Sequence, residues 1–447
     1  MEMNNLTTRL AHYSKSLSAM DSIQVDGRVT QVIGMVIEAS LPKGTLGDIC
    51  NIMRRSGASI RAEIVGFKRG KVLLMPLADT LGIFPGSRVT LSPTPLTVAT
   101  GDGLLGRILD GLGNPIDGKG PLKTTHQTPV HNTPPNPLQR RRIKEPLATG
   151  VRAVDGLLTL GKGQRVGIFA GSGVGKSVLM GMMARYTTAD INVIALIGER
   201  GREVRDFIET NLKEDGLARS IVIVATSDQA AMVRIKGALI ATALAESFRS
   251  QGKDVLLLMD SLTRVAMAQR EIGLAVGEPP TAKGYTPSVF SLLPQLLERA
   301  GTDQAGSITG LYTVLVEGDD MDEPISDASR AILDGHIVLT RKLATRNHYP
   351  AIDVLESVSR LKNEITTPEH KKRAGEVLEL LASHRDSEDL INIGAYNKGS
   401  NPTVDRAIKF MGQMQGFLRQ DMDENTAFTE TQTRLGSIFG REGMAAS

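Results

Sequence analysis

The apolar positions at the start of the chain follow a helical period. Within residues 1–22, apolar side chains recur three or four positions apart, at Leu6, Leu10, Tyr13 and Leu17. This stripe predicts a short amphipathic helix. The pattern leaves open whether the stripe packs on its own domain or binds a partner protein.

Residues 23–97 have a different texture, with short β-type runs separated by glycine. The runs "RAEIVGF" and "KVLLMPL" flank "KRG", which predicts a hairpin with a three-residue loop ending in Gly70. Further strand candidates are "GRVTQVIGMVIEA" and "GSRVTLS". Several short strands so close together are typical of a small β-barrel.

Residues 98–366 alternate between strongly apolar runs and helical stretches. The runs "RVGIFAG", "INVIALIGE", "IVIVATS" and "DVLLLMD" are nearly continuous in apolar residues, as expected of strands buried on both faces of a parallel sheet. This alternation predicts an α/β fold with a doubly wound sheet. The proline- and arginine-rich stretch 129–146 predicts an extended, stiff connector, and we expect its triplet Arg140–Arg142 to be solvated.

The β-type runs stop near residue 366. Thr367 followed by Pro368 is typical of a helix N-terminus, and apolar positions at helical spacing come after it. We therefore expect residues 367–447 to form a helical domain.

Composition narrows the class of protein. The 447 residues carry a formal net charge of +3, from 52 basic and 49 acidic side chains, and contain no tryptophan and 4% aromatic residues. A chain with such balanced charge and so few aromatic rings is not expected to bind nucleic acid. Its single cysteine, Cys50, excludes a disulfide within the chain, which suits a reducing compartment.

The stretch "AGSGVGKS" stands between a predicted strand and a predicted helix, the context that a phosphate-binding loop requires. Its glycines allow backbone amides to converge on phosphate oxygens, and the helix that follows offers further amides. Lys176 is expected to reach the β- and γ-phosphates, and the Ser177 hydroxyl to bind Mg²⁺. Ala170 replaces the usual first glycine, which a negative φ permits. The predicted nucleotide-binding residues here are Ala170, Gly171, Ser172, Gly173, Val174, Gly175, Lys176, Ser177 and Val178.

Two carboxylates follow apolar strands and are expected at the same sheet edge as this loop. Asp260 ends "DVLLLMD" and can hold Mg²⁺. Glu199 ends "INVIALIGE" and either polarises the attacking water or belongs to a surface cluster of charges. In "YPAIDVLESVSR", Tyr349 can stack on a base and Arg360 can act as an arginine finger. The sequence does not show whose phosphate Arg360 reaches.

Together these motifs resemble the catalytic-subunit family of rotary ATPases and, within it, the type III protein-export ATPases of the flagellar branch. The resemblance covers nearly the whole chain and includes "FAGSGVGKSVLMGMMARY", "LIGERGREVRDFIE", "GEPPTAKGYTPSVFSLLPQLLERAG" and "YPAIDVLESVSR". Alanine commonly opens the phosphate loop in the export branch. The resemblance implies a RecA-like core between an N-terminal β-barrel and a C-terminal helical domain, assembled as a homohexamer with sites between subunits.

The resemblance also implies roles for individual residues. It implies that the chain hydrolyses ATP with Mg²⁺. It makes Lys176, Glu199 and Arg360 catalytic groups, with Arg360 entering the neighbouring subunit's site. It makes Ser177 and Asp260 metal ligands, and it puts the tyrosine of "YPAIDVLESVSR" in the adenine pocket.

A place in the cell and a set of partners follow from the same resemblance. The enzyme would promote protein export as a cytoplasmic protein, peripheral at the inner membrane at the flagellar base. The expected partners are a stator-like negative regulator, a coiled-coil central stalk protein, a membrane export gate, and export chaperones with their cargo. The regulator binds the N-terminus in this family, which favours partner docking for the stripe in residues 1–22.

Three other functions remain as alternatives. The ATPase of a virulence injectisome shares all these motifs. A ring-shaped nucleic-acid translocase shares the core and would use the barrel as an oligonucleotide-binding fold, but the few aromatic residues and the balanced charge argue against it. A non-catalytic regulatory subunit would only bind nucleotide, and such subunits typically lack the activating glutamate that this chain has at Glu199.

Overall fold

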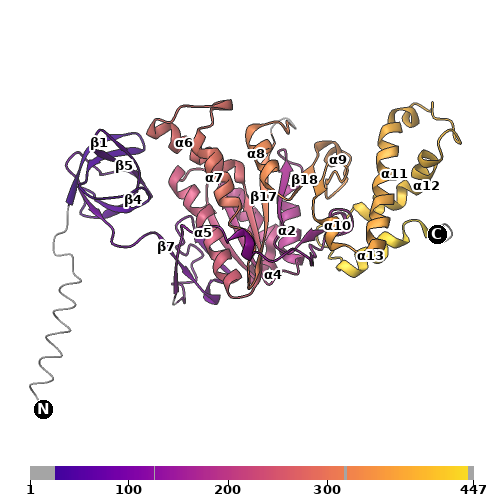
Figure 1. Ribbon diagram of the computed structural model, residues 1–447, viewed down its shortest axis with the longest axis horizontal. Coiled ribbons are helices and arrows are strands. Elements are labelled where there is room, and N and C mark those ends of the chain that lie inside the picture. The colour runs from indigo at the N-terminus through magenta and orange to yellow at the C-terminus, as the bar shows by residue number, and fades with distance from the viewer. Residues whose placement is uncertain (1–25, 125, 317–319, 441–447) are drawn as a thin grey trace, which may run out of the picture. The chain divides into compact units, whose positions relative to one another are not determined.

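The computed structural model describes residues 26–124, 126–316 and 320–440. The chain divides into two compact units, one ending at Leu96 and the other beginning at Thr97 (Figure 1). The predicted helix of residues 1–22 lies outside the described residues. Within the described part of the chain, no helix is both long enough and apolar enough to cross a membrane.

The first unit is the predicted β-barrel. It is closed in the order β1 (Asp26–Ile33), β2 (Val36–Ser40), β5 (Lys71–Pro76), β4 (Ser59–Lys68), β3 (Ile49–Met53) and β6 (Arg88–Leu91). Side chains such as Ile37, Ile52 and Leu74 fill its core. The predicted hairpin is β4–β5, but its loop has two residues rather than three, Arg69 and Gly70. Both have positive φ, because that backbone twist matches the twist of the flanking strands.

The second unit is built on the predicted parallel sheet. Its strand order is β19 (Val358–Ser359), β18 (Gly335–Leu339), β12 (Arg165–Ala170), β17 (Ser307–Leu315), β15 (Asp254–Asp260), β13 (Ile191–Ile197), β14 (Ser220–Ala225) and β8 (Arg107–Asp110), with β16 (Gly301–Thr302) beside β17. Along this path only the pair β18–β19 is antiparallel. Two smaller ladders join β7 (Thr97–Thr100) to β9 (His126–Pro129) and β10 (Pro146–Leu147) to β11 (Leu160–Gly161).

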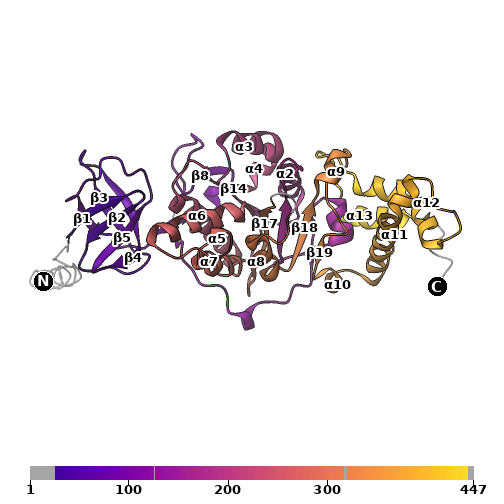
Figure 2. The ribbon, with the colours of Figure 1, turned by 90° about the horizontal axis from the view of Figure 1, so that it is seen from above.

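Helices cover both faces of the large sheet (Figure 2). One face carries α2 (Lys176–Tyr186), α3 (Gly201–Asp206) and α4 (Lys213–Ala218), and the other carries α5 (Ala231–Ser250), α6 (Leu262–Val276), α7 (Pro287–Leu297) and α8 (Pro324–Ile332). Every residue of β13 and β14 is buried as a result. This explains why these strands are apolar throughout rather than alternating.

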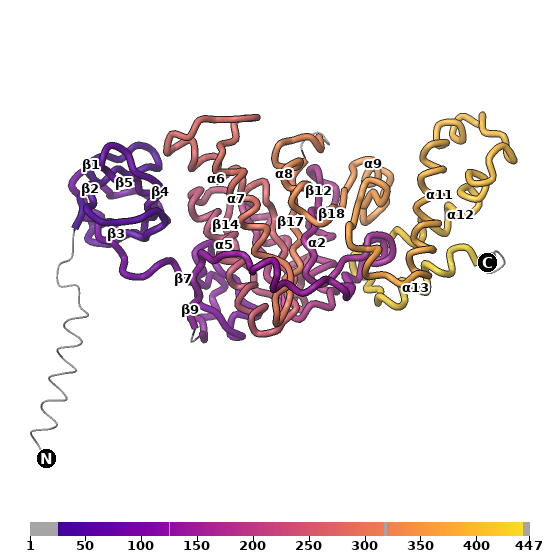
Figure 3. The backbone as a smooth tube through the Cα atoms, in the orientation of Figure 1, coloured from indigo at the N-terminus to yellow at the C-terminus, as the bar shows by residue number. Residues whose placement is uncertain are grey.

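The connector 129–146 runs along the second unit (Figure 3), and one of its arginines, Arg140, is half-buried rather than solvated as expected, whereas Arg141 and Arg142 are exposed. Arg140 donates hydrogen bonds to the carbonyl of Ala300 at 2.7 Å and to that of Glu298. Arg141 donates to two carbonyls of the loop that follows, at 3.0 and 3.2 Å. The chain just after α7 has backbone carbonyls without helical partners, and Arg140 satisfies two of them, while Arg141 bonds carbonyls of the turn between β16 and β17. They thereby fasten the connector to the unit.

The C-terminal helices share their core with the sheet. They are α11 (Pro368–Asn392), α12 (Pro402–Leu418) and α13 (Phe428–Ser437), reached through α9 (Arg341–Thr345) and α10 (Lys362–Ile365). Thr367 caps α11 as the sequence predicts, since its side chain accepts the His370 amide. Val377 and Met414 belong to the same buried cluster as Ile168 of β12. The helical region and the sheet are therefore one packed body.

The helix α2 has no room for a larger residue at Gly181. A Cβ there would lie 2.7 Å from the Asn211 carbonyl oxygen, whereas a Cβ on Gly375 in α11 would have nothing within 4 Å. We expect Gly181→Ala to lower the free energy of unfolding by about 1–3 kcal/mol through overpacking. Gly375→Ala is the matched control and should raise it by about 0.5–1 kcal/mol through helix propensity. Urea unfolding measures both, and equal shifts for the two variants would show that α2 is not tightly packed.

Candidate active site

A cavity of about 700 Å³ opens at the carboxyl edge of the sheet, where β12 ends and α2 begins. Both the phosphate-loop stretch and the segment after β13 contribute to its wall. Val174 points instead into the core, where it is 1% exposed. The other predicted nucleotide-binding residues of this stretch line the cavity: Ala170, Gly171, Ser172, Gly173, Gly175, Lys176, Ser177 and Val178.

The backbone of the loop explains where glycine is required. Gly173 and Gly175 have φ of 77° and 89°, in the left-handed region that favours glycine. Gly175 is the N-cap of α2, so the first amides of that helix are available to an anion. Ala170 is the last residue of β12 and is not among the residues with positive φ. A side chain is therefore tolerated at the position where the strict pattern has glycine.

Three of the predicted site residues meet at this sheet edge. Lys176 Nζ lies 2.5 Å from Asp260 Oδ1 and 3.6 Å from Glu199 Oε1. Asp260 is the last residue of β15, and Glu199 follows β13 by two residues. Because parallel strands end at the same edge, residues 84 positions apart come into contact. Asp260 is only 3% exposed, so its interaction with the ammonium group is weakly screened by water.

The charges at this edge shift each other's pKa. Burial, aided by the charge of Asp260 and opposed by Lys176, raises the pKa of Glu199 to about 7. Burial alone would lower the pKa of Lys176, but Asp260 and Glu199 together raise it above its ordinary value. A carboxylate with a pKa near the working pH is suited to accept a proton from an attacking water.

The oxygen donors of the site fit a hard divalent cation such as Mg²⁺. Ser177 lines the cavity, and Asp260 Oδ1 accepts hydrogen bonds from both Lys176 and the Thr313 hydroxyl, the latter at 2.6 Å. In the described ranges, no three His, Cys, Asp or Glu side chains are grouped to hold a metal. The protein would thus supply few ligands, and phosphate oxygens and water the rest, as Mg²⁺ commonly requires.

Tyr349 lies beside the phosphate loop, and Arg360 does not. A Cβ on Gly175 would lie 3.5 Å from the Tyr349 ring, which is 42% exposed, although Tyr349 is not itself part of the cavity wall. Arg360 follows the edge strand β19, is exposed, and donates to the Arg330 carbonyl at 3.2 Å. It is not part of the cavity wall.

Several residues of the site are absent from the sequence-based prediction, and three of them are charged or hydrogen-bonding side chains with a clear place in it. Arg264 and Arg341 line the cavity and add positive charge, and Thr313 holds Asp260. Thr313 had a signal, because it is a polar residue within the buried apolar run of β17. The two arginines follow β15 and β18 by a few residues and belong to no motif.

This arrangement defines a class of protein. A glycine loop that leads into a helix, with a lysine and two strand-end carboxylates at one edge of a parallel sheet, is the site of a P-loop nucleoside triphosphatase.

Comparison with known families is more specific. The model for the ATP synthase alpha/beta family, nucleotide-binding domain, matches residues 150–359, and the model for its beta-barrel domain matches residues 29–92. The model for the T3SS EscN ATPase C-terminal domain matches residues 366–437. The β-barrel, the nucleotide-binding domain and the C-terminal region of the chain thus each match a domain known from ATP synthase subunits or type III secretion ATPases.

Full-length relatives agree with these matches. The flagellum-specific ATP synthase of Bacillus subtilis is 54% identical over 94% of this chain and 97% of its own length. The type 3 secretion system ATPase of Xanthomonas euvesicatoria is 50% identical over 92% of this chain and 93% of its own. The solved structure of assembled EscN, from the type III secretion system of enteropathogenic E. coli, superposes with a TM-score of 0.88 at 44% identity, covering 92% of this chain and 100% of that chain.

The chain therefore belongs to the ATP synthase alpha/beta family, in the group of flagellum-specific and type III secretion ATPases, and it is an ATPase.

The raised pKa of Glu199 predicts how activity depends on pH. kcat/KM reports the free enzyme, so kcat/KM for ATP should fall by about tenfold per pH unit below pH 7 as the carboxylate takes up a proton. Glu199→Gln should lose activity by roughly 10²–10⁴-fold while its nucleotide affinity stays nearly constant across the same pH range. A flat kcat/KM profile through pH 7 would contradict the role of Glu199, as would an unchanged rate in the variant.

Proposed function

We propose that this ATPase energises protein export by the flagellar type III apparatus. The support is its 54% identity to a flagellum-specific ATP synthase along nearly the full length of both chains. The run of residues 129–206, which resembles the flagellar branch, adds to it. Its place is then the cytoplasmic side of the inner membrane, as a peripheral protein at the flagellar base.

In this proposal the working form is a homohexamer with its sites at subunit boundaries. Arg360 is exposed and lies outside the cavity of its own chain, so it is available to a neighbouring subunit. There its guanidinium stabilises charge on the transferring phosphoryl group. EscN has been solved in assembled form and in complex with its central stalk EscO, which supports a ring and a coiled-coil stalk partner here.

Other segments and partners complete the proposal. The four segments are a partner-binding helix (1–22), a barrel (23–97), the RecA-like ATPase domain (98–366) and a helical domain (367–447). The division between the two compact units after Leu96 supports the second boundary. The first segment would bind a stator-like negative regulator. The export gate, chaperones and cargo are further partners expected of this class.

The site suggests how the reaction proceeds. Arriving phosphates compete with Asp260 and Glu199 for the Lys176 ammonium, which turns from the carboxylates to the β- and γ-phosphates. Asp260 and Ser177 are then the residues that would hold Mg²⁺, which when bound neutralises charge on the phosphate oxygens. Glu199 accepts a proton from the water that attacks the γ-phosphorus, and the bond from that phosphorus to the β–γ bridging oxygen breaks.

Mixed rings test the sharing of sites. Arg360→Ala and Lys176→Ala should each lose activity on their own, since a missing finger costs roughly 10³–10⁵-fold. After co-assembly they should regain measurable ATPase activity, because some boundaries then pair an intact Lys176 with a neighbour's intact Arg360. If Arg360 acts within its own chain, mixing restores nothing.

Deletion in the source organism tests the cellular role. Loss of flagella with normal effector secretion is expected, because the enzyme is assigned to the flagellar apparatus. Normal flagella with lost effector secretion would support the injectisome alternative. The observation that favours this alternative is the 50% identity to a type 3 secretion system ATPase. Restoration of flagella by the wild-type gene but not by a Lys176→Ala allele separates a need for nucleotide from a scaffolding role.

A further inference from the structure

The loop that carries Tyr349 is fastened to the C-terminal helical region. Tyr349 lies between α9 and β19, and its backbone carbonyl accepts a hydrogen bond from the backbone amide of Gln420 at 2.9 Å. Gln420 comes two residues after α12 and is 5% exposed. The segment that would face a base thus depends directly on the chain after α12.

The side chain of Gln420 is held by three further hydrogen bonds. Its Oε1 accepts the Arg152 amide at 2.8 Å, and its Nε2 donates to the carbonyls of Gly150 and Glu424, both at 2.7 Å. Both amide protons and the carbonyl oxygen are therefore engaged. In a buried setting a shift of Gln420 would leave polar groups unpaired, so the residue has one well-defined position.

Arg152 fixes the chain on both sides of Gln420. Its side chain is 3% exposed, and the guanidinium donates to the carbonyl of Phe417 at 3.0 Å and to that of Arg419. It also contacts Glu424 and donates to the Thr426 hydroxyl at 3.1 Å. We call Arg152, Gln420 and these partners the buried node. It joins the end of α12 to the segment that leads into the phosphate-loop strand.

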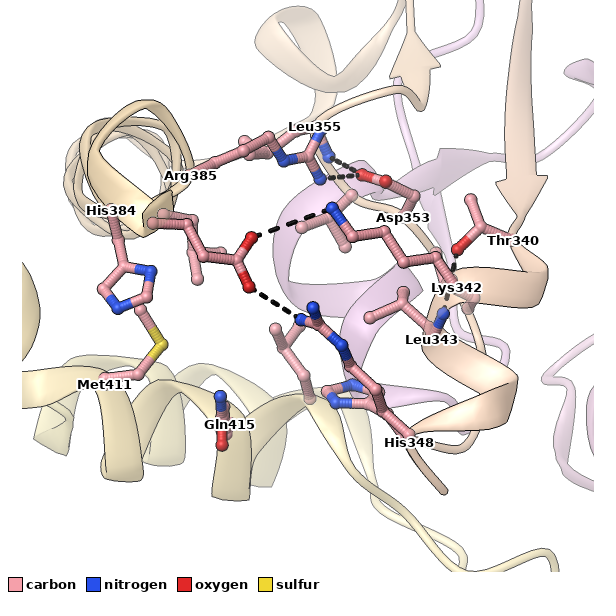
Figure 4. Close-up of a pocket in the computed structure, with 16 residues that line it drawn as sticks. Thr340, Lys342, Leu343, His348, Asp353, Leu355, His384, Arg385, Met411 and Gln415 are labelled. Carbon is pink, nitrogen blue, oxygen red and sulfur yellow. Dashed lines mark hydrogen bonds and ion pairs between the residues drawn. The ribbon is translucent and has the colours of Figure 1, made fainter. Parts of the chain in front are cut away.

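A second set of contacts reaches the same loop from α11, around a cavity of about 320 Å³ (Figure 4). Glu388 pairs with Arg346 at 2.8 Å and with Lys342 at 3.7 Å, and Arg385 pairs with Asp353 at 2.6 Å. The side chains of Lys342 and Arg346 are 66% and 56% exposed, and ion pairs so accessible to water contribute little. The buried node is therefore a stronger attachment than the Glu388 pairs.

We propose that Gln420 is a positioning residue for the base of the bound nucleotide. Its backbone amide donates to the Tyr349 carbonyl and so holds the ring beside Gly175, while the Arg152 backbone amide holds the Gln420 side chain. Affinity for the base then depends on the end of α12, whereas affinity for the triphosphate depends on the loop at Lys176. The inference rests on the proposed role of Tyr349.

Binding of ATP and of inorganic tripolyphosphate to the full-length protein separates the two contributions. Gln420→Met keeps the side-chain length and the backbone bond to Tyr349 but removes the three side-chain hydrogen bonds that hold residue 420 in place. It should weaken ATP binding roughly tenfold and leave tripolyphosphate binding unchanged. In a Tyr349→Ala background it should cause no further loss of ATP affinity. Gln413→Met, on an exposed position of α12, is the matched control and should change neither affinity.

Each other outcome overturns the inference in a recognisable way. Equal losses for ATP and tripolyphosphate would make Gln420 a general structural residue, and additive losses with Tyr349→Ala would separate it from the ring. If Tyr349→Ala leaves ATP affinity unchanged, the proposed base site itself is wrong. If Gln420→Met does not fold, hydrogen exchange of the Gln420 backbone amide in the wild-type protein tests the same link. The Gln420 amide should exchange more slowly with ATP than with tripolyphosphate, and equal exchange would refute the link.

Discussion

The contact between Lys176 and Asp260 is the interaction around which the second unit is organised. An ammonium group and a carboxylate that are both largely removed from water are tolerated only as partners. The sheet brings the two groups together. Only β17 lies between β12, which leads to Lys176, and β15, which ends at Asp260, and Thr313 of β17 donates its hydroxyl hydrogen to the same carboxylate. The cavity beside this pair is therefore preorganised for a polyanion, whose phosphates replace the carboxylates as partners of the lysine.

The packing around the site connects it to the C-terminal helices. The apolar faces of α11 and α12 complete the core that also contains β12, so the helical region is not an appendage. The buried node adds directional hydrogen bonds to this nonpolar packing, and it does so next to Tyr349. If Gln420 positions the Tyr349 ring as proposed, nucleotide binding and the position of the helices are coupled in both directions.

Under the role proposed for Arg360, a single chain is incomplete as an enzyme. Lys176 and Glu199 line one cavity, whereas Arg360 follows β19 and is exposed outside that cavity. A site divided as proposed would link hydrolysis to assembly, because the guanidinium would reach the phosphoryl group only where two subunits meet.

Local properties of the sequence determined much of this architecture. Apolar runs buried on two faces predict parallel strands, glycines at positive φ predict the phosphate loop, and threonine before proline predicts the start of α11. These signals depend on dihedral angles and periodicity within a few residues, so they can be read without knowing the fold.

Contacts between distant residues were decided only by the tertiary structure. Arg152 and Gln420 are 268 positions apart, and neither has a pattern around it that indicates the other. Arg140, expected to be solvated, instead bonds carbonyls 158 and 160 positions away. Arg264 and Arg341 enter the cavity only because their strands end at the same edge as β12. A hydrogen bond between remote segments depends on how helices and strands pack. The periodicity of a single sequence does not indicate which remote segments pack together, so such bonds cannot be predicted from it.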